Sequence, residues 1–303
     1  MIEITHVAVV GSGTMGRQIA LYAARGGYST TIYDADPAAL ARAEAAAPDF
    51  LASLGVSAAD TTAVLGRVRY ASDLTAVREA DLVIEAVPER LDLKRAVFAA
   101  LDEATHEGTI IATNSSSMRV SLLETATVRP ERVANLHFYS PIPDKPMVEI
   151  GGGTRTDPDV LDALAVFAGR IGVLPLRVRR ESTGFIFNRV WRAIKRESLR
   201  VVQEEVSSFE DVDRAWMTMF HTPYGPFGLM DEVGLDVVAD IERHYASESG
   251  DPADLPPPIL TERVARGDLG AKTGRGFYTH PNPAYREPDF LAPAPAFAAP
   301  PEA

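Results

Sequence analysis

Short runs of β-branched and apolar residues alternate with helix-like segments from His6 to about Arg180. The runs predicted as strands are VAVVG, TTIYD, VRY, DLVIEAV, TIIATN, VANLHF and MVEI. Strands that are separated by helices predict βαβ units, and therefore a doubly wound, mostly parallel sheet with helices on both faces. Between the second and third runs, the alanine-rich segment 37–66 predicts a helical pair inserted into this fold.

The pattern changes after Arg180, where strand signals nearly vanish. Apolar residues recur at helical spacing in RVWRAIKRESLRVVQEE, FEDVDRAWMTMF and MDEVGLDVVADIERHYA, which predicts an all-α domain. We therefore expect an α/β domain over residues 1–180 and a helical domain over 181–303. From about residue 281 the chain is rich in proline and alanine, which predicts an irregular tail.

The composition of the chain limits the classes of protein to which it can belong. A chain of 303 residues with 46% hydrophobic and 24% charged residues matches two globular domains. The formal charge of −12 argues against nucleic-acid binding. No apolar run reaches the roughly 18 residues of a membrane span. The absence of cysteine fits a reducing compartment, and the N-terminus shows no signal segment, so we expect a cytoplasmic protein with no membrane partner.

The first strand is followed at once by the glycine pattern of a dinucleotide-binding loop, with Gly11, Gly13 and Gly16 in GSGTMG. Such glycines allow a tight turn, close approach of a pyrophosphate and close packing of helix on strand. The second strand ends at Asp34, at the spacing expected for a carboxylate that binds the adenosine ribose. Asp36 stands where a 2′-phosphate would require a cation, so NAD is favoured over NADP. The alternative is a glycine-rich turn that happens to precede a helix.

An NAD site requires a base that removes the proton of a substrate hydroxyl as the hydride leaves. His137 ends a predicted strand at the edge where doubly wound sheets bind ligands. Glu149 lies in the apolar run MVEI, where a buried carboxylate needs a partner such as an imidazole. The residues alone leave two interpretations open: an acid/base pair, or a core histidine and a glutamate that faces water. His221 is the second candidate base, and no obvious carboxylate backs His280.

Two further polar positions stand out. Asn114 and the serines that follow it end another predicted strand, where a hydroxyl would polarise a reacting oxygen or, equally, cap a helix. Asn188 lies inside the first helix of the second domain, where asparagine is a mediocre helix former and a polar role fits.

Several motifs in register resemble the L-3-hydroxyacyl-CoA dehydrogenase family, including its 3-hydroxybutyryl-CoA dehydrogenases. They are GSGTMG, IEAVPERLDLK, TNSSS, NLHFYSP, MVEI, STGFIFNR, PYGPFGLMDEVGLD and KTGRGFY. The resemblance implies a Rossmann domain that binds NAD, with a helical-pair insertion, followed by an all-α domain that mediates dimerisation. It also implies an enzyme of fatty acid metabolism that oxidises a 3-hydroxyacyl thioester to the 3-ketoacyl form, or catalyses the reverse.

Residue by residue, the resemblance implies that His137 is the catalytic base and Glu149 its orienting carboxylate. It places the substrate-binding serine at Ser116 and the family's asparagine at Asn188. The cofactor-binding positions that it implies are Gly11, Gly13, Gly16, Asp34, Glu89, Lys94 and Asn114.

The chain departs from the family pattern where the acyl carrier would bind. The insertion carries Arg42 against Glu44, Asp49 and Asp60, which makes it a poor cradle for the 3′-phosphate of coenzyme A. Ser140 replaces the asparagine of the family motif H-F-F-N-P. Coenzyme A is the expected carrier, and the alternatives are an acyl carrier protein or a free 3-hydroxy acid. A catalytically retired cofactor-binding protein is disfavoured because the four catalytic positions are retained.

A basic run at 177–200 compensates for the acidic insertion. Arg189, Arg192, Arg196 and Arg200 recur at helical spacing and could form one stripe. One interpretation is a site for a phosphate or a carboxylate of the substrate. The other, which charge runs more often represent, is a solvated helix face paired with nearby acidic residues.

Overall fold

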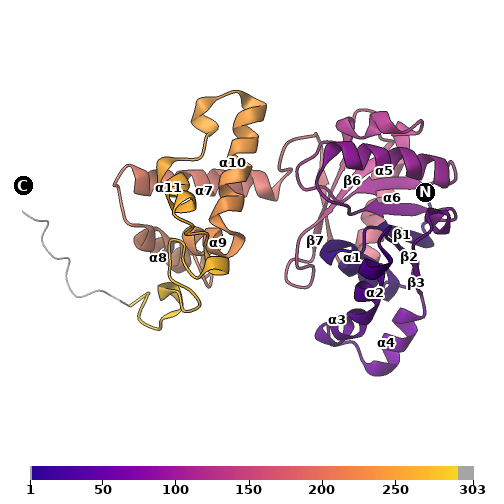
Figure 1. Cartoon of the computed structure of the whole chain (residues 1–303), viewed down its shortest axis with the longest axis horizontal. Coiled ribbons are helices and arrows are strands. Elements are labelled where there is room, and N and C mark those ends of the chain that lie inside the picture. Colours follow the sequence, from indigo (N-terminus) through magenta and orange to yellow (C-terminus); the bar gives the residue numbers. More distant parts are fainter. Residues whose placement is uncertain (1, 293–303) are drawn as a thin grey trace, which may run out of the picture. The chain divides into compact units, whose positions relative to one another are not determined.

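The computed structural model describes residues 2–292 and divides the chain into two compact units (Figure 1). The first unit ends at Ile186 and the second begins at Phe187, a few residues after the boundary predicted at 180. No helix within 2–292 is both long and apolar enough to cross a membrane.

The first unit contains an eight-stranded sheet in the order β3-β2-β1-β4-β5-β6-β7-β8. All neighbouring strands are parallel except β6 and β7, which are antiparallel. The prediction of a doubly wound, mostly parallel sheet is therefore confirmed. The strands are β1 (His6–Val10), β2 (Ser29–Tyr33), β3 (Val68–Ala71), β4 (Leu82–Glu85), β5 (Ile110–Thr113), β6 (Val133–Phe138), β7 (Met147–Gly152) and β8 (Leu174–Val178).

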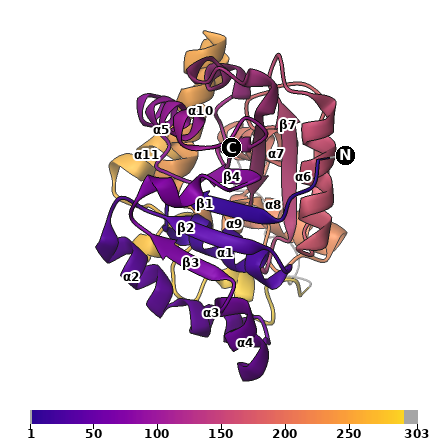
Figure 2. The same ribbon diagram turned by 90° about the vertical axis from the view of Figure 1, so that its right-hand side faces the viewer.

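Helices cover both faces of this sheet (Figure 2). Helices α1 (Thr14–Arg25) and α6 (Pro158–Arg170) pack on one face, and α5 (Leu91–Ala104) packs on the other. The sheet contributes apolar side chains to a core on each of its faces. The central strands β4 and β5 are buried along their whole length. The short 3₁₀ helices of this unit are η1 (Leu74–Val77), η2 (Val120–Leu122), η3 (Glu124–Ala126) and η4 (Pro130–Arg132).

The insertion that was predicted as a helical pair consists of three short helices. They are α2 (Pro37–Ala45), α3 (Ala47–Ser53) and α4 (Ala58–Leu65), and Ala46 caps both α2 and α3. Pro48 explains the break, because proline lacks an N–H and its ring clashes with the carbonyl of the preceding turn.

Strand β8 was missing from the sequence prediction. Its sequence, LPLRV, contains Pro175, and proline within a run argues against a strand. The structure resolves the conflict because β8 is the edge strand next to β7, where an absent N–H leaves no partner unpaired.

The antiparallel pairing of β6 with β7 places His137 directly opposite Glu149. Because side chains alternate between the faces of a strand, the flanking Phe138 and Val148 point into the core beneath α6. His137 and Glu149 therefore share the opposite face of the sheet.

The second unit, as far as residue 292, is built from helices packed on a second apolar core. Ser208 caps α8 by accepting a hydrogen bond from the Asp211 N–H. The elements are α7 (Phe187–Gln203), α8 (Phe209–Phe220), α9 (Pro226–Val233), α10 (Leu235–Ser249), α11 (Pro258–Ala265), η5 (Pro252–Asp254), η6 (Ala271–Thr273) and η7 (Ala284–Arg286). The predicted tail packs partly into this core through Tyr285 and Phe290, and residues 293–303 lie outside the described part of the chain.

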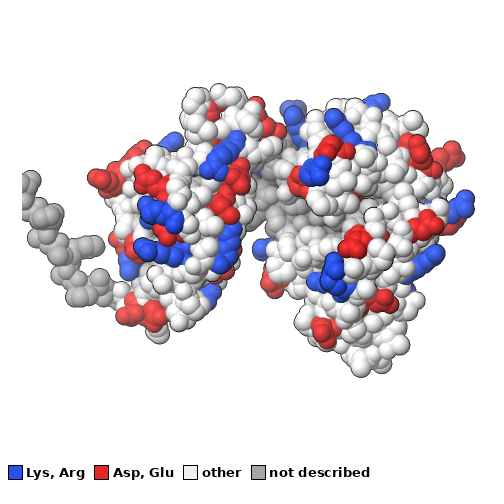
Figure 3. Space-filling view, in the orientation of Figure 1, with Lys and Arg blue, Asp and Glu red and all other residues white. Residues whose placement is uncertain are grey.

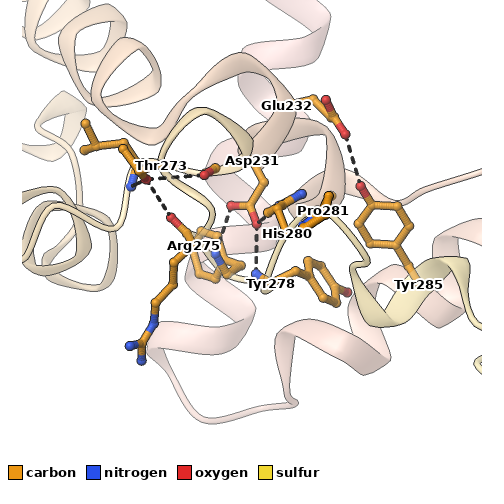
Figure 4. A network of polar contacts seen from close by, with 12 residues as sticks. Asp231, Glu232, Thr273, Arg275, Tyr278, His280, Pro281 and Tyr285 are labelled. Carbon is orange, nitrogen blue, oxygen red and sulfur yellow. Dashed lines mark hydrogen bonds and ion pairs between the residues drawn. The ribbon is translucent and has the colours of Figure 1, made fainter.

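Buried carboxylates hold the last part of the second unit together (Figure 4). Asp231 accepts hydrogen bonds from the backbone N–H groups of Phe277 and Tyr278, and the ring of His280 lies 3.1 Å from it. Asp213 is likewise buried, and its burial raises its pKa to about 6 although backbone N–H groups and the Tyr278 hydroxyl bond to it. These bonds satisfy carboxylates that would otherwise be costly to bury.

The glycines of the β1–α1 loop differ in what each position tolerates. Gly11 has φ +102°, a conformation that favours glycine, and its N–H donates to the Tyr33 carbonyl at 2.8 Å. A Cβ atom at Gly16 would lie 1.8 Å from the Gly11 carbonyl oxygen. A Cβ atom at Gly13 would meet nothing within 4 Å. The first and third glycines are therefore required by the fold, whereas the second leaves open space beside the loop.

This contrast predicts opposite effects of two alanine substitutions. Gly16→Ala should lower the free energy of unfolding by about 1 to 3 kcal/mol, because a backbone carbonyl has to move. Gly13→Ala should leave thermal stability unchanged yet weaken NAD binding at least tenfold, roughly 1.4 kcal/mol, because the methyl group fills the space that a pyrophosphate would enter. Thermal unfolding and NAD titration of both variants test this. Wild-type NAD affinity in Gly13→Ala would contradict it.

Candidate active site

The carboxyl ends of β1, β2, β4, β5 and β6 meet at one edge of the sheet, and the predicted site residues of the first unit gather there. The glycine loop follows β1, Asp34 follows β2, Asn114 follows β5 and His137 lies near the end of β6. This is the edge at which doubly wound sheets bind ligands.

Asp34 is held in an ionised, oriented state. It accepts hydrogen bonds from the Ser12 N–H at 2.7 Å, the Ser12 hydroxyl at 2.8 Å and the Asp36 N–H at 3.0 Å. Burial would raise the pKa of Asp34, but these hydrogen bonds outweigh it and hold the pKa below its ordinary value. A carboxylate has about four acceptor positions, so after these three hydrogen bonds capacity remains for a ribose hydroxyl.

The residues of this edge fit NAD. The open space beside Gly13 lies at the N-terminus of α1, where free N–H groups and the helix dipole favour phosphate. Asp34 and Asp36 carry negative charge where the extra phosphate of NADP would lie, which matches the prediction of NAD. No group of three or more potential metal ligands occurs among residues 2–292.

Lys94 forms a buried ion pair with Glu85 and a second ion pair with the more exposed Glu89. The Lys94 side chain is 1% exposed, and its Nζ lies 2.7 Å from Glu85 and 3.2 Å from Glu89. Glu85 is completely buried and also accepts hydrogen bonds from the Val87 N–H and the Thr113 hydroxyl. Removing one partner from such a pair costs roughly 3 to 5 kcal/mol, because a buried charge is left unpaired. The network therefore locks the end of β4 to the end of β5.

Glu85 was missed by the sequence prediction. It occupies the last position of β4, within the otherwise apolar run LVIE, and a carboxylate there is the same signal that singled out Glu149 in MVEI. The lysine that satisfies it stands nine residues later, on α5.

The loop after β5 supplies both structural and exposed polar groups. The Asn114 amide oxygen accepts a hydrogen bond from the Phe138 N–H at 2.9 Å, which ties this loop to the end of β6. The hydroxyls of Ser115 and Ser117 donate to Glu89. Ser116, the predicted substrate-binding serine, is exposed between them.

His137 and Glu149 form a buried pair. The His137 Nδ1 lies 3.0 Å from the Glu149 Oε2, and the two side chains belong to residues 5% and 0% exposed. The Ile186 N–H donates to the Glu149 Oε1 at 2.8 Å, and the Tyr139 hydroxyl donates to Oε2 at 2.8 Å. The structure thus brings together the two residues whose pairing the sequence alone left open.

The pair has a definite chemical consequence. An ionised carboxylate only accepts hydrogen bonds, so the contact with Glu149 requires the proton of the neutral imidazole to be on Nδ1. The Nε2 of His137 is then unprotonated and can accept a proton from a substrate. Positive charge that develops on the ring would be stabilised by the carboxylate.

The other histidines lack this combination. His221 adopts a left-handed conformation at the end of α8, with φ 55°. The expectation that no carboxylate backs His280 is wrong, because Asp231 lies 3.1 Å from its Nε2 (Figure 4). Both oxygens of Asp231 also hold backbone N–H groups, so this pair fastens the chain after α11 rather than exposing a base.

Asn188 and the regularly spaced arginines of the basic run, Arg189, Arg192, Arg196 and Arg200, belong to α7 in the second unit. Arg192 pairs with Glu242 and Asp254, Arg196 pairs with Asp254, and Arg200 pairs with Glu197 and Glu204. On the face shown in Figure 3, acidic and basic side chains of this unit are interspersed. The structure therefore favours a paired helix face for these three arginines over an open anion site.

Comparison with known proteins agrees with the fold. The family model of the 3-hydroxyacyl-CoA dehydrogenase NAD-binding domain matches residues 6–182, and the model of the family's C-terminal domain matches residues 184–280. A 3-hydroxybutyryl-CoA dehydrogenase of Mycobacterium tuberculosis is 35% identical, covering 91% of this chain and 99% of the relative. A 5-formyl-3-hydroxy-2-methylpyridine 4-carboxylate 5-dehydrogenase of Mesorhizobium japonicum is 32% identical, covering 91% of each chain.

A solved structure gives the same result. The crystal structure of 3-hydroxybutyryl-CoA dehydrogenase from Escherichia coli superposes with a TM-score of 0.87 at 35% identity, over 91% of this chain and 60% of that one. The chain belongs to the 3-hydroxyacyl-CoA dehydrogenase family and is an NAD-dependent oxidoreductase.

Proposed function

We propose that this protein oxidises a 3-hydroxyacyl-CoA to the 3-ketoacyl-CoA with NAD, or catalyses the reverse reaction. The observation that carries the proposal is the buried pair of His137 and Glu149 at the same sheet edge as the glycine loop. Relatives named for 3-hydroxybutyryl-CoA support the thioester.

In this proposal His137 is the general base. Its Nε2 takes the proton of the 3-hydroxyl group as the C3–H bond breaks and the carbonyl forms. Bound NAD supplies the acceptor for the hydride. Glu149 stabilises the imidazolium that results, and in the reverse direction His137 returns the proton to the oxygen.

Ser116 and Asn188 complete the proposed site. Ser116 is exposed, and its hydroxyl is of the kind that can donate a hydrogen bond to the substrate oxygen. Asn188 is assigned from the family resemblance, as are Gly11, Gly13, Gly16, Asp34, Glu89, Lys94 and Asn114 for the cofactor. A homodimer and a cytoplasmic location also belong to the proposal, and a substrate bound to an acyl carrier protein is an alternative to the coenzyme A thioester.

A free hydroxy acid is the second candidate substrate. In the insertion, over 37–65, Arg42 is the only cationic residue, and its exposed side chain pairs with Asp36 at 3.5 Å. Little positive charge is therefore available there for the phosphates of coenzyme A. The relative from Mesorhizobium japonicum is named for a free pyridine carboxylate, which supports this alternative.

Replacing His137 should separate catalysis from cofactor binding. His137→Gln is expected to lower kcat by about a thousandfold, because general base catalysis is lost, while NAD affinity stays near that of the wild type. NADH formation and an NAD titration measure the two effects.

The matched control is His221→Asn, which tolerates the left-handed backbone at that position and should retain turnover. Near-wild-type turnover in His137→Gln, or loss confined to His221→Asn, would overturn the assignment of the base.

The carrier is tested by comparing substrates. With NADH as the reductant, kcat/KM for acetoacetyl-CoA should exceed that for free acetoacetate at least tenfold, roughly 1.4 kcal/mol, because contacts to the carrier contribute binding energy in the transition state. Equal or greater kcat/KM with the free acid would favour the second candidate.

A further inference from the structure

We propose that Tyr139 is a positioning residue that holds Glu149 in place and limits the negative charge that this carboxylate presents to His137. The inference rests on the proposed function, because Tyr139 acts on the reaction only through the base. It extends the pair of His137 and Glu149 to a group of three residues, all of which belong to the first unit of the structure.

The geometry places Tyr139 on the same oxygen that His137 uses. The Tyr139 hydroxyl lies 2.8 Å from Glu149 Oε2, and the His137 Nδ1 lies 3.0 Å from that same atom. The other oxygen, Oε1, accepts the Ile186 N–H at 2.8 Å. The carboxylate is therefore bonded at both oxygens, and its plane is fixed relative to the imidazole.

The rings of Tyr139 and His137 also pack on each other. Their centroids are 4.4 Å apart with an interplanar angle of 55°. Phe185, which follows β8 in the chain, also packs near His137, with ring centroids 5.8 Å apart. Tyr139 comes two residues after His137, so an extended chain directs both side chains to the same face of the sheet. The tyrosine thus restricts the direction in which the Nε2 of His137 points.

The hydroxyl has an electrostatic effect as well. Donation of an O–H group to an ionised carboxylate is a strong hydrogen bond that stabilises the charge and draws it from the shared oxygen. The Nδ1–H of His137 then meets a weaker acceptor than it would without Tyr139. The Tyr139 hydroxyl therefore reduces the stabilisation that Glu149 gives to the imidazolium.

The residues that face Glu149 from the neighbouring strands are uncharged, and several nearby charged groups bind other partners. On β8 the neighbour of Glu149 is Leu176, and on the β5 side the contact to β6 is the uncharged Asn114. Arg177 lies opposite Ile150, on the alternate face from Glu149. Among the charged groups of the flanking segments, Arg177 binds Asp162, Lys145 binds the Ser140 carbonyl, and Glu181 binds the Ser121 N–H.

Tyr139→Phe removes the hydroxyl and keeps the ring, so it tests the proposal with little change of packing. In the oxidation direction, the acid limb of kcat/KM should move to higher pH by several tenths of a pH unit. The plateau kcat should fall several-fold, and the KM for NAD should not change. The position of the limb does not depend on how much enzyme is folded, so it reports the electrostatic role even if stability falls.

Two controls separate the possible outcomes. Tyr28→Phe removes the hydroxyl of another buried tyrosine of the same unit and should leave the acid limb in place. His137→Gln, measured in parallel, tests the proposed base itself. If His137→Gln is inactive but Tyr139→Phe keeps the wild-type limb or moves it to lower pH, the role of Tyr139 is overturned and the proposed function stands. If His137→Gln is active, the proposed function fails instead.

Discussion

Burial of the Glu149 carboxylate is the constraint on which the rest of the site depends. A charged group with no exposure to water is unfavourable unless hydrogen bonds replace its solvation. Donors from separate sources do so, among them the His137 ring, the Tyr139 hydroxyl and the backbone of Ile186. Because the carboxylate cannot donate, the proton of the imidazole is held on Nδ1. A requirement of folding thereby sets the tautomer of a potential base.

The sheet explains why this pair lies where a cofactor can use it. Parallel strands β1 to β6 bring the glycine loop, Asp34 and Asn114 to one edge, and the single antiparallel step to β7 brings Glu149 back to His137. Glu85 at the end of β4 is a second buried carboxylate at this edge, and its charge is balanced by Lys94 from α5. Stability and chemistry at this edge therefore rest on the same kind of interaction.

Local patterns allowed much of the architecture to be predicted from the sequence. The glycine loop, Asp34 and seven of the strands follow from spacing and periodicity, which depend on residues close in the chain. The pair of His137 and Glu149 stayed undecided on the residues alone, because pairing depends on whether β7 runs parallel or antiparallel to β6. The catalytic interpretation of the two residues followed from the resemblance to a family and not from periodicity.

The features that were missed depend on contacts between distant segments or on proline. The hydroxyl of Tyr139 matters only through Glu149, and His280 meets Asp231 across 49 residues. Pro175 concealed an edge strand, and Pro48 divided a predicted helix. The basic run of α7 finds partners at Glu242 and Asp254, far beyond the nearby acids that the sequence offered.

The tautomer of His137 tests the central claim most directly. ¹⁵N NMR of histidine-labelled enzyme, with the His137 signals identified by their absence in His137→Gln, reports which ring nitrogen carries the proton. The account predicts that the neutral ring is protonated on Nδ1, which faces Glu149, and unprotonated on Nε2. A neutral ring protonated on Nε2 would contradict it, because the nitrogen assigned to accept the substrate proton would already be occupied.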